Sequence, residues 1–282
     1  MSTVNIIGVP EHFNLPWHMA IEEGAFANRG IDLKWTDIPE GTGRMCQLLE
    51  KGEADIAIIL TEGIVKSITE GNTVKIAQEY IASPLLWGIH VAENSPYKKL
   101  SDLEQGTAAI SRFGSGSHLM AYVNAQRLGW DVHQLQFEIA NHLDGAVAAL
   151  QNNKASYFMW EHFTTKPLVD SGVFRRIDDC PTPWPCFVVA VTDRFIAQHK
   201  NTLKHILEVI NLYTKEFKQI PSIDHTLANR YAQQLPDIKE WLSLTQWSQQ
   251  PLSTQTLTVV QDQLLALSLI AKKLPANAIL LD

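Results

Sequence analysis

Short apolar runs rich in β-branched residues alternate with longer amphipathic stretches over the first two thirds of the chain. This alternation is typical of α/β domains with mostly parallel strands. A first β-α-β series ends near residue 80, and a second one follows it. The predicted strands lie at residues 4–9, 32–37, 55–60, 74–80, 107–110, 136–139 and 157–160.

Glycines follow most of the predicted helices, because glycine readily adopts the left-handed conformation that ends a helix. Gly30, Gly52 and Gly71 follow helices predicted at residues 17–28, 43–51 and 63–70. In the second series the predicted helices occupy residues 117–128, before Gly129, and 143–151.

One passage of the first series can be aligned with one of the second. Residues 49–58 superpose on residues 150–159 in sequence, and both end a helix and begin a strand. Gly52 then aligns with Asn153, and these are the residue types that tolerate the left-handed conformation. The alignment favours two halves of shared architecture, although ordinary helix-to-strand turns often look similar.

Beyond residue 193 the period is helical, with amphipathic helices predicted at residues 203–217, 223–235 and 254–274. A strand at residues 187–192 would return the chain to the first series. We therefore expect two lobes, each a mixed, mostly parallel sheet flanked by helices, and a helical C-terminal tail. Lobe 1 would take residues 1–88 and 189–282 and lobe 2 residues 89–188, with a ligand cleft between the lobes.

Composition and charge exclude several classes of protein. The 282 residues include 23 Lys and Arg against 30 Asp and Glu, and no dense basic block, which argues against nucleic acid as a partner. The longest apolar stretches, such as residues 56–60, are far below the ~18 residues of a membrane span. Cys46, Cys180 and Cys186 are too scattered for a disulfide framework or paired zinc ligands.

The first nine residues contain no Lys or Arg and run directly into Pro10 and Glu11. This is not the pattern of a signal peptide. We expect a cytoplasmic protein, or a periplasmic one if an export segment has been removed.

The sharpest local signal is the serine–glycine loop, residues 111–118, between a predicted strand and a predicted helix. Its glycines allow close approach of the backbone to a ligand, and Ser115 or Ser117 can cap the helix. Free N–H groups in the first helical turn favour an anionic or strongly accepting ligand atom. The loop matches neither a P-loop nor Gly-x-Gly-x-x-Gly, and the alternative is an ordinary flexible loop with an N-cap.

Aromatic and charged residues gather in the other loops that follow predicted strands, where open α/β sheets bind ligands. Together they suit a small ring with hydrogen-bond donors and an acidic group, although some of these aromatics will fill lobe cores. The predicted ligand-binding residues are His12, Phe13, Trp17, Arg44, Thr61, Glu62, Trp87, Arg112, Phe113, Ser115, Gly116, Ser117, His118, Trp160 and Glu161.

Histidines in these loops leave an enzymatic alternative open, with His118 or His12 as an acid/base. No His-Glu-x-x-His, His-x-His or Gly-x-Ser-x-Gly motif is present. We therefore expect no bound metal and no cofactor, and no enzyme activity in the preferred interpretation.

The frame of Gly41-Thr-Gly43, residues 49–58 and the serine–glycine loop resembles the type II periplasmic-binding-protein fold. The resemblance covers roughly residues 4–190 and is greatest to the sulfonate-, nitrate- and thiamine-pyrimidine-binding branch, in particular its uncharacterised unexported members. It implies two lobes, two crossover hinges, and contacts from Ser115, Gly116 and Ser117 to the ligand.

The resemblance also implies a function. Its members are solute-binding proteins that close on a small molecule, here an aromatic or heterocyclic one such as a thiamine pyrimidine, with ABC-transporter components as partners if exported. Cytoplasmic relatives of the fold include enzymes of thiamine-pyrimidine and menaquinone synthesis. The cysteine-rich iron-site motif of the pyrimidine-forming proteins has no counterpart among Cys46, Cys180 and Cys186.

Overall fold

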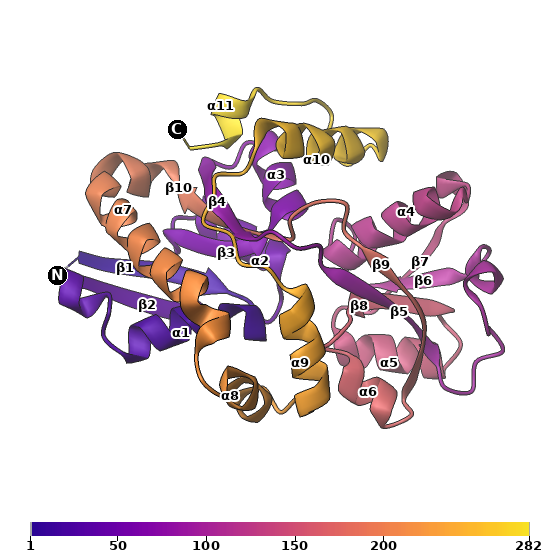
Figure 1. Cartoon of the computed structure of the whole chain (residues 1–282). Coiled ribbons are helices and arrows are strands. Elements are labelled where there is room, and N and C mark those ends of the chain that lie inside the picture. Colours follow the sequence, from indigo (N-terminus) through magenta and orange to yellow (C-terminus); the bar gives the residue numbers. More distant parts are fainter. Residues whose placement is uncertain (1, 282) are drawn as a thin grey trace. The chain divides into compact units, whose positions relative to one another are not determined.

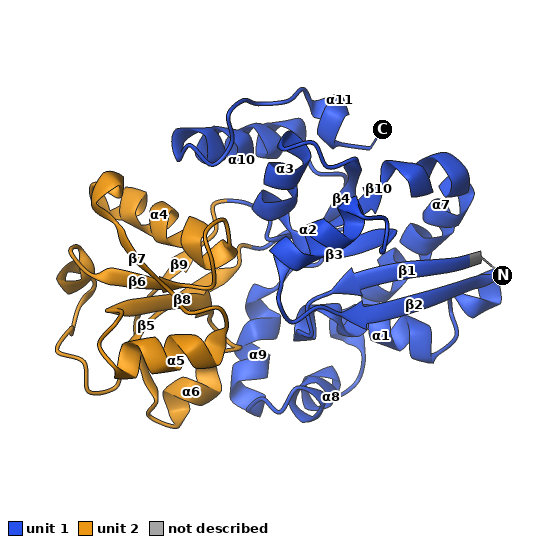
Figure 2. Cartoon of the chain, turned by 180° about the vertical axis from the view of Figure 1, so that it is seen from behind, with its two compact units in different colours: residues 1–83, 184–282 blue, residues 84–183 orange. Residues whose placement is uncertain are grey.

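The computed structural model describes residues 2–281, which form two compact units (Figures 1 and 2). Unit 1 contains the chain up to Ser83 and again from Trp184, whereas unit 2 is the continuous segment Pro84–Pro183. Each unit holds a five-stranded sheet with helices packed on it. The expected α/β fold of two mixed, mostly parallel sheets and a helical C-terminal region is confirmed.

The sheet of unit 1 has the strand order β2-β1-β3-β10-β4. Its first three strands are parallel, and β10 runs antiparallel to both of its neighbours. Strand β3 is apolar throughout, and all six residues of β10 are buried, as expected for strands covered on both faces. The strands are β1 (Ser2–Gly8), β2 (Ile31–Asp37), β3 (Ile56–Leu60), β4 (Val74–Ile81) and β10 (Phe187–Thr192).

The sheet of unit 2 repeats this arrangement in the order β7-β6-β8-β5-β9. Three parallel strands come first, and β5 is the antiparallel strand in the fourth place, where unit 1 has β10. The two units therefore share one topology. The strands are β5 (Leu86–Ala92), β6 (Thr107–Ile110), β7 (Gln136–Ile139), β8 (Tyr157–Glu161) and β9 (Phe174–Pro181).

The helices connect and cover the strands of their own unit (Figure 2). In unit 1 they are α1 (Leu15–Glu22), α2 (Thr42–Glu50), α3 (Thr61–Thr69), α7 (Asp193–Glu216), α8 (Ile223–Arg230), α9 (Leu235–Leu244), α10 (Thr254–Ala266) and α11 (Ala276–Ile279). In unit 2 they are α4 (Gly116–Leu128), α5 (Leu143–Gln151) and α6 (Lys166–Asp170).

The predicted correspondence between the two halves is confirmed at the turns that lead from α2 to β3 and from α5 to β8. Gly52 and Asn153 both adopt the left-handed conformation, with φ of 68° and 56°. The N–H of Gly52 donates to Leu49 O at 3.0 Å, and the N–H of Asn153 donates to Leu150 O at 3.2 Å. The same turn geometry thus ends a helix and starts a strand in each unit.

Some sequence-based boundaries were wrong. The helix predicted at 17–28 ends at Glu22, because Gly24 turns left-handed with φ of 73°. Those predicted at 223–235 and 254–274 end at Arg230 and Ala266, before left-handed Ala232 and Ser268. Strand β9 was missed because four charged residues, Arg175, Arg176, Asp178 and Asp179, hide the apolar alternation of an edge strand.

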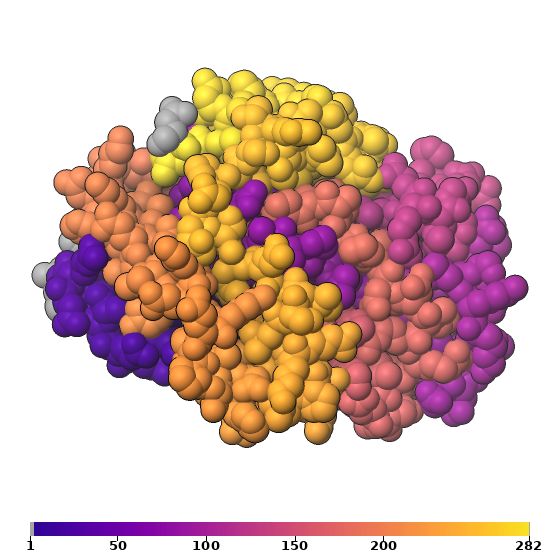
Figure 3. Space-filling model, viewed as in Figure 1, coloured from indigo at the N-terminus to yellow at the C-terminus, as the bar shows by residue number. Residues whose placement is uncertain are grey.

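The C-terminal segment of unit 1, from α10 onwards, packs on α3 and β4 of the same unit. Helix α10 contacts α3, and the N–H of Leu281 donates to Ile76 O of β4 at 2.9 Å. In the space-filling view its side chains, drawn in yellow, form one continuous layer (Figure 3). Among residues 2–281, no helix is long and apolar enough to cross a membrane.

Candidate functional site

The strand directions place the loops of unit 2 that can bind a ligand on one edge of its sheet. Strands β6, β7, β8 and β9 all end at this edge, where β5 begins. Open α/β sheets bind ligands beyond the carboxyl ends of their strands. A ligand-binding site in unit 2 is therefore expected at the loops that follow β6 and β8.

The serine–glycine loop joins β6 to α4 through a set of serine hydroxyls that hold one another. Ser115 is the N-cap of α4, and its Oγ accepts a hydrogen bond from the N–H of His118 at 3.3 Å. The Oγ of Ser117 accepts from the N–H of Ser111 at 3.0 Å and lies 3.1 Å from the Oγ of Ser115. Gly114 has φ of 78°, which a side chain would disfavour. The loop is thus held in a defined conformation.

This conformation leaves backbone donors at the start of α4. Gly116 and Ser117 are the first two residues of the 13-residue helix, so their N–H groups have no partner within it. Arg112, half-buried in the same loop, forms no ion pair with any residue from 2 to 281. Donors, the positive end of the helix and an uncompensated guanidinium together favour an anionic group here.

An aromatic surface flanks the loop. Phe113 is 61% exposed, and its ring contacts those of His118 and Phe137 edge-on, with centroids 5.2 and 6.0 Å away. Such exposure is costly for a large apolar side chain, and a flat ligand stacked on the ring would reduce it. His118 is fixed as a support, because its Nδ1 accepts from the N–H of Gly114 at 3.1 Å. Burial lowers the pKa of His118.

The end of β8 contributes a buried carboxyl group. Glu161 is 4% exposed, and its Oε2 accepts from the N–H of Thr164 at 2.6 Å. Burial raises the pKa of Glu161 above its ordinary value. Trp160, before it, stacks on Phe158 with a centroid distance of 5.4 Å, and Trp87 of β5 meets it edge-on at 6.3 Å. Trp87 is 5% exposed.

In unit 1, the corresponding edge carries Thr61 and Glu62 at the start of α3. The Oγ of Thr61 donates to Pro185 O at 2.5 Å. The Oε2 of Glu62 accepts from the indole N–H of Trp184 at 2.7 Å, whereas its buried Oε1 has no hydrogen-bond partner among residues 2–281. Burial raises the pKa of Glu62 to about 7. The carboxyl group of Glu62 therefore changes its charge near neutral pH.

Three other candidates of unit 1 lie inside it. His12, Phe13 and Trp17 are 2%, 4% and 0% exposed. The ring of His12 lies 4.2 Å from that of Trp241 in α9, and burial lowers the pKa of His12 to about 3. Arg44 is half-buried on α2, where it donates to the side chain of Gln47 at 3.4 Å.

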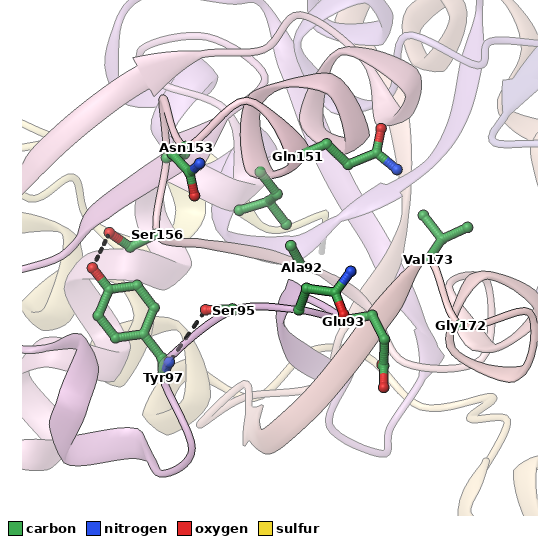
Figure 4. Close-up of a pocket in the computed structure, with 12 residues that line it drawn as sticks. Ala92, Glu93, Ser95, Tyr97, Gln151, Asn153, Ser156, Gly172 and Val173 are labelled. Atoms are coloured by element: carbon green, nitrogen blue, oxygen red, sulfur yellow. Dashed lines mark hydrogen bonds between the residues drawn. The ribbon is translucent and has the colours of Figure 1, made fainter.

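A cavity of about 250 Å³ lies on the opposite edge of unit 2, where β6 and β8 begin (Figure 4). The Oγ of Ser156 donates to the Oη of Tyr97 at 3.3 Å at one side of it. Asn153 and Gly172, both left-handed, form part of its rim. The sequence did not indicate this cavity, because its residues come from turns without a motif. Among residues 2–281, no group of three or more His, Cys, Asp or Glu could hold a metal ion.

Comparison with known proteins agrees with this architecture. The sequence model of the Ca3427-like PBP family matches residues 87–180, most of unit 2. The solved structure of the Candida albicans CA3427 gene product, described as defining a new family with the generic periplasmic binding protein fold, is 26% identical, with a TM-score of 0.90 over 100% of this chain and 96% of that chain.

Two sulfonate-binding proteins are similar in structure at lower identity. The alkanesulfonate-binding protein SsuA from Xanthomonas axonopodis pv. citri, bound to MOPS, is 15% identical, with a TM-score of 0.82 over 99% of this chain and 98% of that chain. The periplasmic aliphatic sulphonate-binding protein SsuA from Escherichia coli is 15% identical, with a TM-score of 0.73 over 100% and 92%. No curated protein sequence matches the chain.

Proposed function

We propose that this chain, which has the periplasmic-binding-protein fold, is a small-molecule-binding protein whose ligand combines a flat ring with an anionic or strongly accepting group. The observation that carries the proposal is the serine–glycine loop at the carboxyl edge of unit 2. It holds serine hydroxyls and the N–H groups of Gly116 and Ser117 at the start of α4, and Arg112 belongs to the same loop. The MOPS bound to one similar protein carries a sulfonate, which is a group of this class.

Each half of the ligand has its own support in unit 2. The first turn of α4 suits the anionic group, because its donors need no rearrangement to bind it. The exposed ring of Phe113 suits the flat part, since stacking requires an uncovered face.

Ser115→Ala is expected to weaken binding of benzenesulfonate about 10- to 100-fold, because a hydrogen bond to a charged group contributes about 1.5–3 kcal/mol. Isothermal titration calorimetry with benzenesulfonate, MOPS, benzoate and a thiamine-type aminopyrimidine would measure the affinities. Ser101→Ala, at an exposed serine elsewhere in unit 2, should leave them unchanged.

Loss of the N-cap also destabilises α4, by about 1 kcal/mol. Ser115→Thr separates the two effects, since threonine retains both the cap and the hydroxyl, and it should restore most of the affinity. Equal binding by wild type and Ser115→Ala would contradict the site. If none of the four compounds binds, and native mass spectrometry of the purified protein detects no small molecule, the proposed function is wrong.

Phe113→Ala is expected to reduce affinity for benzenesulfonate about 3- to 10-fold while leaving affinity for methanesulfonate unchanged. An aromatic contact contributes about 0.5–1.5 kcal/mol, and methanesulfonate has no ring to stack. Thermal stability should change little, because the side chain is 61% exposed. An equal loss for both sulfonates would show that Phe113 shapes the loop instead of stacking on the ligand.

A further inference from the structure

A histidine and an aspartate of unit 2, outside the serine–glycine loop, form a hydrogen-bonded pair. His162 follows β8, and its Nδ1 lies 2.8 Å from the Oδ1 of Asp179 on β9. Backbone pairing holds both residues in place: the N–H of His162 donates to Leu86 O at 2.9 Å, and Asp179 pairs with Gly88 across the sheet. The backbones of both residues are therefore held in place by the sheet.

The surroundings keep Asp179 ionised. Burial opposes its ionisation, but the hydrogen bond to His162 and the charge of Arg176 hold its pKa below the ordinary value. Arg176 also donates from Nη1 to the backbone oxygen of His162 at 3.3 Å. The other titratable neighbours include Glu161, before His162 in the chain, His90 on β5 and Cys180, after Asp179. Arg127 of α4 also donates from Nη1 to the backbone oxygen of Asp179 at 3.0 Å.

The second ring nitrogen of His162 is available. A carboxylate at Nδ1 favours the tautomer in which Nδ1 carries the proton and Nε2 presents a free lone pair. The side chain is 15% exposed, and Nε2 makes no hydrogen bond with any residue from 2 to 281. This is the arrangement of a general base: one ring nitrogen donates its proton to a carboxylate, and the other is open to solvent or to a ligand.

The other buried histidines do not share this arrangement. The Nδ1 of His118 is occupied by the N–H of Gly114, and His12 is enclosed by the rings of Phe13, Tyr231 and Trp241. His90 has Nδ1 at 3.3 Å from Phe158 O and Nε2 at 2.9 Å from the Oγ of Thr165. The geometry thus favours His162 over the two histidines that the sequence suggested for acid/base chemistry.

His162 also lies at the same sheet edge as the serine–glycine loop. Strands β6 and β8 are adjacent and parallel, with Ala108 opposite Tyr157 and Ala109 opposite Phe158. Extending that register brings the ends of the two strands together, about 4.8 Å apart in a sheet. The loop and the residues that follow β8 therefore share one edge of the sheet, and the His162 ring is turned to Asp179 on β9, on the other side of β5.

We propose that His162 is a general base and Asp179 its positioning residue, so that unit 2 catalyses hydrolysis of small acyl esters. Placing the natural substrate at the serine–glycine loop rests on the proposed function, whereas the chemistry of the pair does not. In the reaction, Nε2 takes a proton from water as the water oxygen bonds to the acyl carbon. The ester C–O bond then breaks, and Nε2 returns the proton to the departing oxygen, so that acid and alcohol are formed.

The test uses 4-nitrophenyl acetate, whose hydrolysis to acetate and 4-nitrophenol is followed by absorbance. His162→Gln is expected to lower the protein-dependent rate at least tenfold. His133→Gln is the matched control, because His133 is an exposed histidine of the same unit, and it should change the rate less than twofold. A rate for His162→Gln within twofold of that control, or no protein-dependent hydrolysis by wild type, would overturn the proposal.

Asp179→Asn tests the positioning role of Asp179. It also provides a second test of the proposal if His162→Gln does not fold. Long-range ¹H–¹⁵N NMR of histidine-labelled protein should show His162 with its proton on Nδ1 in wild type and a mixture of tautomers in Asp179→Asn, with a rate loss of about tenfold. An unchanged tautomer and rate would contradict the pairing. If sulfonates bind while hydrolysis ignores His162→Gln, only this inference fails; if they do not bind but His162→Gln abolishes hydrolysis, only the proposed function fails.

Discussion

Trp17→Ala is expected to lower the free energy of unfolding by about 3–5 kcal/mol, the range for truncating a buried tryptophan. Trp17 has no exposed surface and packs against three rings of unit 1. Their centroids are 5.9 Å (Phe26), 6.3 Å (Trp35) and 6.2 Å (Tyr80) away. The substitution removes these contacts and leaves a cavity that neighbouring strands cannot fill. Chemical denaturation of both proteins would measure the loss.

Two variants make the result specific. Trp17→Phe should cost markedly less, because it retains most of the apolar volume. Leu212→Ala, at a side chain 55% exposed on α7, should change stability by no more than about 0.5 kcal/mol. A loss below 1 kcal/mol for Trp17→Ala, with a fall in ligand affinity of the folded protein, would instead favour the sequence-based prediction that Trp17 contacts the ligand.

Glu62→Gln is expected to remove a large part of the pH dependence of stability. Because burial raises the pKa of Glu62 to about 7 in the folded state, the folded protein retains this proton at pH values where the unfolded chain has lost it. The resulting stability is fully present below pH about 4.5 and is lost as pH rises through 7. A shift of this size corresponds to about 3 kcal/mol.

Denaturation at pH 5, 6, 7 and 8 would reveal the effect. Glutamine remains neutral and can still accept the hydrogen bond of Trp184, so the variant should be the more stable protein at pH 8. Glu40→Gln, at an exposed carboxylate, should retain the wild-type slope. Parallel pH profiles for wild type and Glu62→Gln would contradict a raised pKa at this position.

The same two residues illustrate the limits of the sequence for the site. Trp17 and Glu62 both occupy loops or first turns after predicted strands, and that position suggested ligand contact for each. Only the packed structure distinguishes them, because it encloses Trp17 among rings while leaving one oxygen of Glu62 without a partner. His162 directly follows a predicted strand, but its partner Asp179 lies on a strand that the sequence did not indicate.

The local sequence determined the secondary structure elements, turns and helix caps, which depend on residues close together along the chain. Hydrophobic period placed the parallel strands, glycine and asparagine placed the left-handed turns at Gly52 and Asn153, and Ser115 capped α4, because each of these is set within a few residues. Tertiary structure decided which strands pair with one another, which aromatic side chains are buried, and which carboxylate hydrogen-bonds to His162. Those outcomes follow from packing and burial between segments far apart in sequence, which no local pattern records.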